Sequence, residues 1–191
     1  MFGSVRNPTA LLAVLMVVGG CMSPNADTTQ GKRNAVHQMR SETLAELYKL
    51  EPYARTRIRQ ALGYAVFSNV GVNVIWFSAG VGYGIVENNR TGKKTYMKMA
   101  SAGLGLGLGV KDFRGIFVFT SEGALRQFVE SGWDVSAQAD AAAKAGKKGG
   151  AWAGAVDVAP GIKLYQITKN GLALQATIQG TKYWKDGELN S

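Results

Sequence analysis

Cys21 has the most specific chemical setting in this sequence, because it is the only cysteine among 191 residues and it closes an apolar run. Residues 10–18 (ALLAVLMVV) are all apolar, and Val18-Gly19-Gly20 leads from them to the thiol. A short apolar stretch behind a positive N-terminus, closed by small residues, is typical of a secretory signal peptide. Nine residues are too few for a helical membrane span, which needs about 20. We therefore expect residues 1–20 to be a signal peptide.

The residues before Cys21 resemble the lipobox of bacterial lipoproteins, with Val18 in place of the usual Leu and Gly19 in a position often held by Ala or Ser. The resemblance implies cleavage before Cys21 and several acyl chains on its thiol. Stable anchoring needs more than one chain, so this would be a permanent membrane anchor. Met22 stands where an Asp often retains such proteins at the inner membrane, which implies the periplasmic face of the outer membrane. The alternative is a secreted protein with a free thiol.

Other residues capable of catalysis are few. His37 is the only histidine, and we expect it on the surface of the first helix. The 13 acidic residues are scattered, without a paired motif for metal-assisted hydrolysis or glycoside cleavage. A single cysteine excludes disulfides and metal sites built from several thiolates. We therefore expect no catalytic residues, no metal and no cofactor, and hence not an enzyme.

The charge balance points to an anionic partner. Loss of Arg6 with the signal peptide lowers the formal charge from +9 to +8. Basic proteins are attracted to nucleic acid or anionic lipid, and a lipid-anchored secreted protein rarely meets nucleic acid. We expect binding to anionic phospholipid, unless the charge only maintains solubility. The candidate headgroup-binding residues are Lys32, Arg33, Arg55, Arg57, Arg59, Lys144, Lys147 and Lys148.

The elements that would position these residues follow from periodicity. Residues 21–31 are polar and predict a flexible, lipidated tether. Residues 32–62 predict two helices, the first with Val36, Met39, Leu47 and Leu50 near one apolar face and the second running from Glu51 to Leu62, with Pro52 in its first turn.

Residues 63–185 predict a β-rich domain with period-two alternation. The expected strands are 64–68, 72–87, 95–110, 115–120, 135–142, 151–158, 162–168 and 172–179, with Asn170-Gly171 as a hairpin turn. Ser121 and Gly132 bound a short inserted helix. The predicted fold class is α+β, a mainly antiparallel sheet of about eight strands, barrel- or sandwich-like, with two N-terminal helices and one inserted helix.

Alternating glycines form a second pattern. In a strand, Gly103, Gly105, Gly107 and Gly109 share one face, and Gly80, Gly82 and Gly84 repeat the pattern in the preceding strand. If these strands pair, they make a smooth patch that demands close approach by another group. Tight packing by a helix or the opposite sheet wall is one interpretation, and a groove for an acyl chain or a flat lipid is the other. The strict spacing of two, with no helix following, excludes a dinucleotide-binding loop.

Three stretches resemble the SYLF domain family. Residues 62–86 look like the family's opening strands, residues 96–135 carry the Ala-Ser-Ala-Gly entry, the alternating glycines and the Glu-Gly-Ala-Leu helix, and residues 169–182 resemble its closing hairpin. Ser68, where many members carry Pro, and Gln175, near an expected Gly, depart from the pattern. Eukaryotic members bind phosphoinositides and fungal relatives bind actin, whereas bacterial members look like envelope lipoproteins.

The resemblance therefore implies a lipid-binding module without catalysis, with neither actin nor phosphoinositide expected as a partner in the periplasm. The competing hypothesis is a structural envelope protein that contacts another envelope protein or peptidoglycan.

Overall fold

A computed structural model of the chain describes residues 28–74, 77–104, 113–134, 152–168, 170–173 and 180–191. Several sequence predictions lie outside the described residues: the signal peptide, Cys21, the strand at 135–142, and the site residues Gly105, Gly107, Gly109, Lys144, Lys147 and Lys148. Within the described part, no helix is long and apolar enough to cross a membrane.

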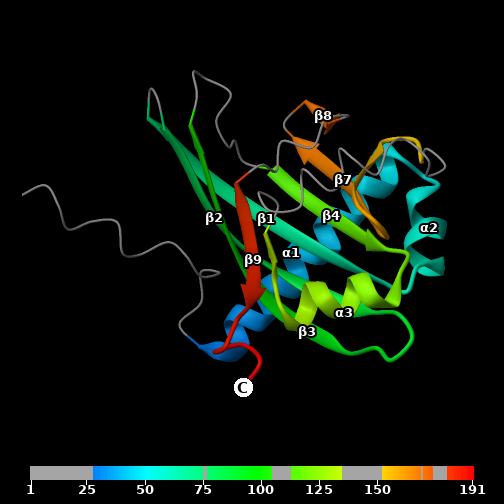
Figure 1. The fold of residues 1–191 in the computed structure, drawn as a ribbon, viewed down its shortest axis with the longest axis horizontal. Helices are drawn as coiled ribbons and strands as arrows, with labels where there is room; N and C mark the ends of the chain where they lie inside the picture. Colours follow the sequence, from blue (N-terminus) through cyan, green and yellow to red (C-terminus); the bar gives the residue numbers. More distant parts are fainter. Residues whose placement is uncertain (1–27, 75–76, 105–112, 135–151, 169, 174–179) are drawn as a thin grey trace, which may run out of the picture.

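The described elements are three helices and nine strands (Figure 1). In chain order they are α1 (Thr29–Leu50), α2 (Ala54–Gln60), β1 (Gly63–Val74), β2 (Phe77–Asn88), β3 (Lys94–Leu104), β4 (Phe113–Phe119), α3 (Glu122–Glu130), β5 (Trp133–Asp134), β6 (Ala155–Ala159), β7 (Ile162–Thr168), β8 (Gly171–Ala173) and β9 (Thr181–Lys185).

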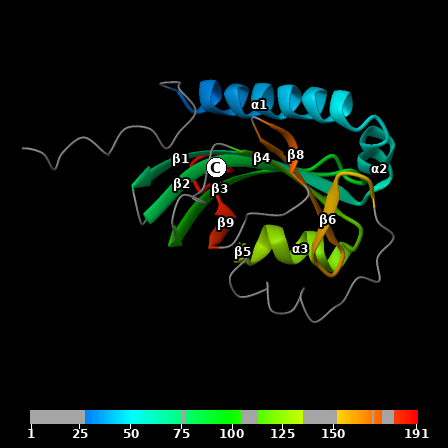
Figure 2. The same cartoon turned by 90° about the horizontal axis from the view of Figure 1, so that it is seen from above.

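The strand pairs of the described residues are all antiparallel. The strands form one curled sheet in the order β5-β9-β3-β2-β1-β4-β7-β6, with β8 also paired to β7. Figure 2 shows α1 lying across one face of this sheet and α3 lying against the other, inside the curl. We call these the outer face and the inner face. The α+β prediction of a mainly antiparallel sheet with two N-terminal helices and one inserted helix is confirmed.

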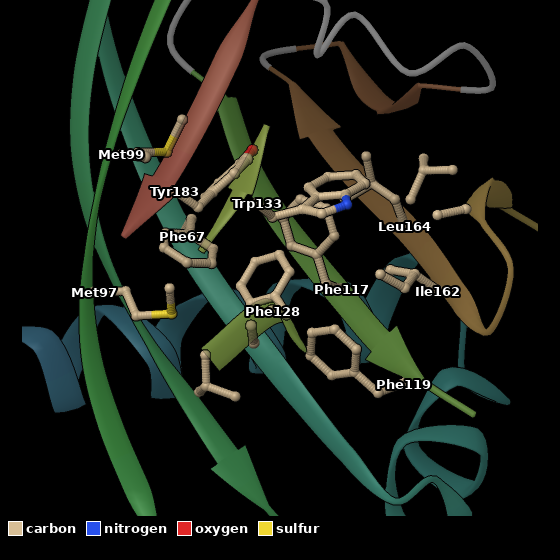
Figure 3. Packing of buried hydrophobic residues seen from close by; sticks show 14 of the residues in the cluster. Phe67, Met97, Met99, Phe117, Phe119, Phe128, Trp133, Ile162, Leu164 and Tyr183 are labelled. Carbon is tan, nitrogen blue, oxygen red and sulfur yellow. The ribbon is translucent and has the colours of Figure 1, made fainter. Parts of the chain in front are cut away.

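Each face of the sheet carries its own apolar cluster, because successive side chains of a strand point to opposite faces. On the inner face, Phe128 of α3 packs among rings and thioethers of the strands, which are Phe67, Met97, Met99, Phe117, Phe119, Trp133 and Tyr183 (Figure 3). On the outer face, α1 and α2 contribute Val36, Met39, Leu47, Ala54 and Ile58, which pack with Val66, Ile85, Ile116 and Val118 from the sheet.

Several local predictions are confirmed by the structure. β7 has the predicted bounds, and its hairpin to β8 turns at Gly171, whose φ is +96°. Ser121 is the N-cap residue of α3, and Gly132 follows its C-cap with φ +73°, the left-handed conformation that glycine adopts most easily.

Other boundaries differ from the predictions. Residues 72–87 do not form one strand, because β1 continues to Val74 and β2 begins at Phe77, in register from Gly63↔Asn88 to Val74↔Phe77. The helix α1 begins at Thr29, where Thr28 Oγ1 accepts a hydrogen bond from the Gly31 N–H at 3.0 Å, so the tether ends before residue 31. β9 was not predicted, and the folded body continues past 185 to Leu189, which is buried.

Candidate membrane-contact surface

The junction between α1 and α2 presents two large apolar side chains to solvent. α1 ends at Leu50 and α2 begins at Ala54, so the chain turns at Glu51, Pro52 and Tyr53. Leu50 is 44% exposed and Tyr53 is 74% exposed, and they are the large hydrophobic residues that stand out as exposed in the described structure. We call Lys49, Leu50, Tyr53, Arg55 and Arg59 the helix-corner surface.

The corner is held in place from beneath. Leu47, Ala54 and Ile58 are buried against the outer face of the sheet at 0–2% exposure. Asn89, in the turn after β2, donates through Nδ2 to the main-chain oxygens of Ile58 at 2.7 Å and Ala61 at 2.9 Å. These bonds satisfy carbonyls at the end of α2 that have no partner within the helix. The exposed side chains therefore sit on a fixed backbone.

Three cations flank the exposed apolar pair along the chain. Lys49, Arg55 and Arg59 are all exposed, and the Arg55 guanidinium lies over the Tyr48 ring, 4.5 Å from its centroid. Burial of the Tyr48 hydroxyl raises its pKa, against the opposing effect of Arg55, so the tyrosine stays neutral near pH 7. The single acid of the turn, Glu51, faces Arg57 at 3.8 Å. The exposed part of the corner is thus cationic.

Arg57 does not belong to this exposed group, although the sequence analysis placed it there. Its Nη1 donates to the Tyr165 hydroxyl at 3.1 Å and to the Ala153 oxygen at 3.2 Å, and its guanidinium lies 5.4 Å from the centre of the Trp152 ring. Arg57 therefore links α2 to the β6–β7 region. Of the three arginines predicted on this helix, Arg55 and Arg59 remain available at the surface.

Lys32 and Arg33 are likewise engaged within the protein. Lys32 Nζ donates to Glu188 Oε1 at 2.7 Å. Arg33 donates through Nε to the Leu189 oxygen at 3.0 Å and through Nη2 to the Ser191 oxygen at 2.7 Å. Both cations hold residues 188–191 against the first turns of α1, about 26 Å of helix away from the helix corner. The structure does not bring them together with Arg55 and Arg59.

The glycines of β2 meet side chains of their own sheet. β2 and β3 do pair, but the register sets Gly80, Gly82 and Gly84 opposite Ser101, Met99 and Met97, and Gly103 opposite Ser78. A Cβ added at Gly84 would lie 2.3 Å from Phe67 Cδ1, and one at Gly82 would lie 2.2 Å from the Ser68 oxygen. Other groups approach these glycines closely, as predicted. The alternative prediction of a smooth groove is wrong for Gly80, Gly82 and Gly84, because atoms of the neighbouring strands fill the space above them.

His37 faces the sheet and is half-buried, which differs from the expected place on the helix surface. Its Nε2 lies 2.9 Å from the Tyr96 hydroxyl, within hydrogen-bond distance. Burial lowers the pKa of His37, and the positive charges of Arg40 and Lys94 lower it further. The histidine therefore serves in the contact between α1 and β3.

A cavity of about 200 Å³ opens between α3 and the β2–β3 turn. Its floor is apolar, from Val86, Leu125 and Val129, and its rim carries both signs of charge, from Lys93, Arg126, Glu122 and Glu130. None of the residues selected from the sequence lines it. Among the described residues, no three His, Cys, Asp or Glu side chains gather as a metal site would require.

The sequence analysis missed the two apolar members of the helix-corner surface. It assigned Leu50 to the buried face of the first helix, and it did not select Tyr53. Pro52 was the available signal, because a proline that follows a helix forces the chain to change direction. Residues beside such a turn lose contact with the face that the helix buries.

Comparison with known proteins finds a relative in Aeromonas veronii. The chain is 34% identical over 165 residues to Beta cell expansion factor A of Aeromonas veronii. The match covers 86% of this chain and 61% of the relative, so this chain spans about three fifths of the curated relative's length. No family model matches the sequence.

Proposed function

We propose that this protein is a lipid-anchored envelope protein whose SYLF-like domain binds anionic phospholipid at the membrane surface, without catalysis. The observation that carries the proposal is the helix-corner surface, where exposed Tyr53 and Leu50 lie among Lys49, Arg55 and Arg59. Tyrosine favours the interface between headgroups and acyl chains, because its ring is apolar and its hydroxyl polar. Each Lys or Arg near an anionic bilayer contributes about 1 kcal/mol.

The proposed anchor at Cys21 is compatible with contact between the helix-corner surface and the membrane. Residues 21–28 would span about 15 Å as a flexible chain between an acylated Cys21 and the start of α1. The helix corner lies at the other end of α1, about 33 Å further on. An anchor at one end and the corner at the other would lay α1 along the bilayer of the outer membrane, on its periplasmic face.

Vesicle co-sedimentation of residues 22–191, which lack the acylated cysteine, tests the proposal. We expect binding to vesicles containing phosphatidylglycerol or cardiolipin, and much weaker binding to phosphatidylcholine alone. The double substitution Arg55→Gln, Arg59→Gln removes about 2 kcal/mol, or roughly a 30-fold change in partitioning. Tyr53→Ser should weaken binding without abolishing the preference for anionic lipid.

Arg90→Gln is the matched control, because Arg90 is an exposed arginine in the turn after β2, with 68% of its side chain exposed. It should bind vesicles like the unmodified chain. Equal binding to neutral and anionic vesicles would refute the proposal. A stable protein or peptidoglycan partner that depends on Tyr53 and Arg55, with no lipid preference, would favour the structural alternative, since tyrosine and arginine are also frequent in protein interfaces.

A further inference from the structure

The inner face of the sheet contains polar side chains that are buried and unpaired. Asn69, Ser101, Trp133 and Tyr183 are 1%, 4%, 3% and 0% exposed. In the described structure the Asn69 amide, the Ser101 hydroxyl, the Trp133 indole nitrogen and the Tyr183 hydroxyl have no hydrogen-bond partner. A buried polar group without a partner costs about 1–3 kcal/mol, so four on one face require an explanation.

Strand register places these groups together. Asn69 pairs with Gly82, Gly82 with Met99, Met99 with Tyr183, and Tyr183 with Trp133, so one row crosses five strands. Directly paired residues point to the same face of a sheet. Asn69, Tyr183 and Trp133 thus share a row on the inner face, in which Gly82 follows Asn69 and Met99 is the central residue.

Ser101 joins them from the adjacent row. It pairs with Gly80, and a Cβ at Gly80 would lie 2.5 Å from Ser101 Oγ, 2.7 Å from Asn69 Oδ1 and 2.8 Å from Asn69 Nδ2. The Asn69 and Ser101 side chains therefore converge above Gly80, from the strands on either side of β2. Because Gly80 has no side chain, both polar groups can occupy this position.

Of the two aromatic members, Tyr183 directs its hydroxyl away from the centre of the packed core. In Figure 3 the Tyr183 oxygen points away from Phe128 and Phe119, and the Trp133 nitrogen lies on the side of Leu164. The Tyr183 ring packs on Phe67 at 4.7 Å between centroids, so its body is fixed while its hydroxyl is unpaired. Burial raises the pKa of Tyr183 far above its usual range, and the hydroxyl remains a proton donor.

The four groups define what a ligand must offer. The indole N–H can only donate, so it needs an acceptor, whereas Asn69 Oδ1 can only accept, so it needs a donor. A carboxylate or phosphate supplies no donor for Asn69 Oδ1, and an ammonium supplies no acceptor for Trp133. None of the four groups is charged, and burying an unpaired ion would be costly.

We infer that Asn69, Ser101, Trp133 and Tyr183 form a binding site for a neutral hydroxyl-bearing group, such as the glycerol moiety of a lipid or a free polyol. A hydroxyl both donates and accepts, so adjacent hydroxyls satisfy the amide, the serine and the two aromatic donors together. The site lies on the face opposite α1 and does not depend on the helix-corner surface. An experiment that refutes this binding site would therefore leave the proposed membrane contact of the helix corner untouched, and the reverse also holds.

Thermal unfolding of the full mature protein, purified from its host and stripped of bound lipid, tests this site. The probes are monoolein in mixed micelles for the lipid-borne group, and glycerol and glucose for the free polyols. We expect one class to raise the Tm saturably. Polyols also stabilise proteins nonspecifically by exclusion from the surface, but that effect is the same in every variant.

Ser101→Ala and Tyr183→Phe each remove one oxygen and keep the packing. Without probe we expect their Tm to equal or exceed that of the unmodified protein, because they delete unpaired polar atoms. With probe, the specific part of the shift should be lost. Tyr165→Phe is the matched control: it removes a hydroxyl that Arg57 does bond, so its Tm should fall while the probe shift remains.

Two results would overturn the inference. A fall in Tm for Ser101→Ala and Tyr183→Phe, like that for Tyr165→Phe, would mean that their hydroxyls are already satisfied in the free protein. Equal probe-induced shifts in all variants would mean that only water occupies the site. Loss of the monoolein shift alone identifies a lipid-borne ligand, and loss of the glycerol or glucose shift alone identifies a free polyol; either supports the site.

Discussion

The two faces of the sheet are held by different forces. Inside the curl, aromatic rings contact one another: Phe117 lies 5.2 Å from Tyr183 and 5.4 Å from Phe128 between centroids. On the outer face, polar links join α1 and α2 to the strands, through Arg40 with Glu87, His37 with Tyr96, Glu46 with Arg114, and Arg57 with Tyr165. The comparison teaches that contacts between rings hold the inner face, while polar links added to an apolar cluster fix where the helices lie on the outer face.

The largest effect should come from the centre of the inner face. Phe117 is fully buried and lies within 5.9 Å, centroid to centroid, of four other rings. Phe117→Ala should lower the free energy of unfolding by about 3–5 kcal/mol, measured by chemical denaturation. The neighbouring outer-face substitution Ile116→Val is the control and should cost about 0.5–1.5 kcal/mol. A loss well below 3 kcal/mol for Phe117→Ala would contradict the central place of this ring in the inner-face cluster.

The next effect is overpacking of the same face at Gly84. An alanine Cβ there would lie 2.3 Å from Phe67 Cδ1 and 2.4 Å from the Val66 oxygen. Gly84→Ala should reduce the free energy of unfolding by about 1–3 kcal/mol, since ring and backbone must shift. Gly187→Ala, at a position with no atom within 4 Å of the added Cβ, should be neutral. A neutral Gly84→Ala would show that the inner face has room to adjust.

On the outer face, neutralising Glu87 should lower the free energy of unfolding by a smaller amount, and the loss should depend on salt. Its Oε2 accepts from Arg40 Nη1 and, at 3.1 Å, from the Tyr64 hydroxyl, whose pKa is raised to about 12, mainly by burial. Glu87→Gln should cost about 1–2 kcal/mol, discounted because both ionic side chains are about one fifth exposed. Added salt should narrow the difference from the unmodified protein. Glu42→Gln, an exposed acid bonded to Gln38, is the control.

The smallest expected effect is the pH dependence of the free energy of unfolding that arises from His37, on the outer face. The pKa of His37 in the folded protein is below its ordinary value near 6.5, so the unfolded chain binds more protons between those two values. Stability must therefore rise with pH across that window and fall on acidification below about 6.5. Urea unfolding between pH 5 and 8 measures the slope, and His37→Gln should flatten it. An unchanged slope in the variant would assign the titration to another group.

Much of the fold could be predicted because local signals agreed with tertiary structure. β7 alternates and is bounded by turn residues, and Ser121 and Gly132 mark the ends of α3. The hairpin between β1 and β2 was missed, because residues 70–76 continue the apolar alternation without a strong turn signal. β9 was missed because its five residues include two lysines, and its position depends on pairing with β3, about 80 residues earlier.

The sequence predicted a cationic surface on the second helix, but it did not show which residues form that surface. Net charge and the arginines of the second helix pointed to an anionic partner. No local pattern distinguishes Arg33, which bonds an oxygen 158 residues away, from Arg59 at the surface. The unpaired inner-face groups were equally hidden, because Asn69 and Ser101 meet only through the register of β1, β2 and β3.

The edge of the sheet formed by β6 and β8 has a consequence for how the protein behaves at high concentration. Along β7 the outermost positions are divided between β6 and the three-residue β8, and the β6 pairing shifts register between Asp157 and Ala159. A long, regular border would invite strand addition by a second molecule and lead towards aggregates. Here the interrupted border offers a visiting strand no continuous row of donors and acceptors, which favours separate molecules even at high concentration.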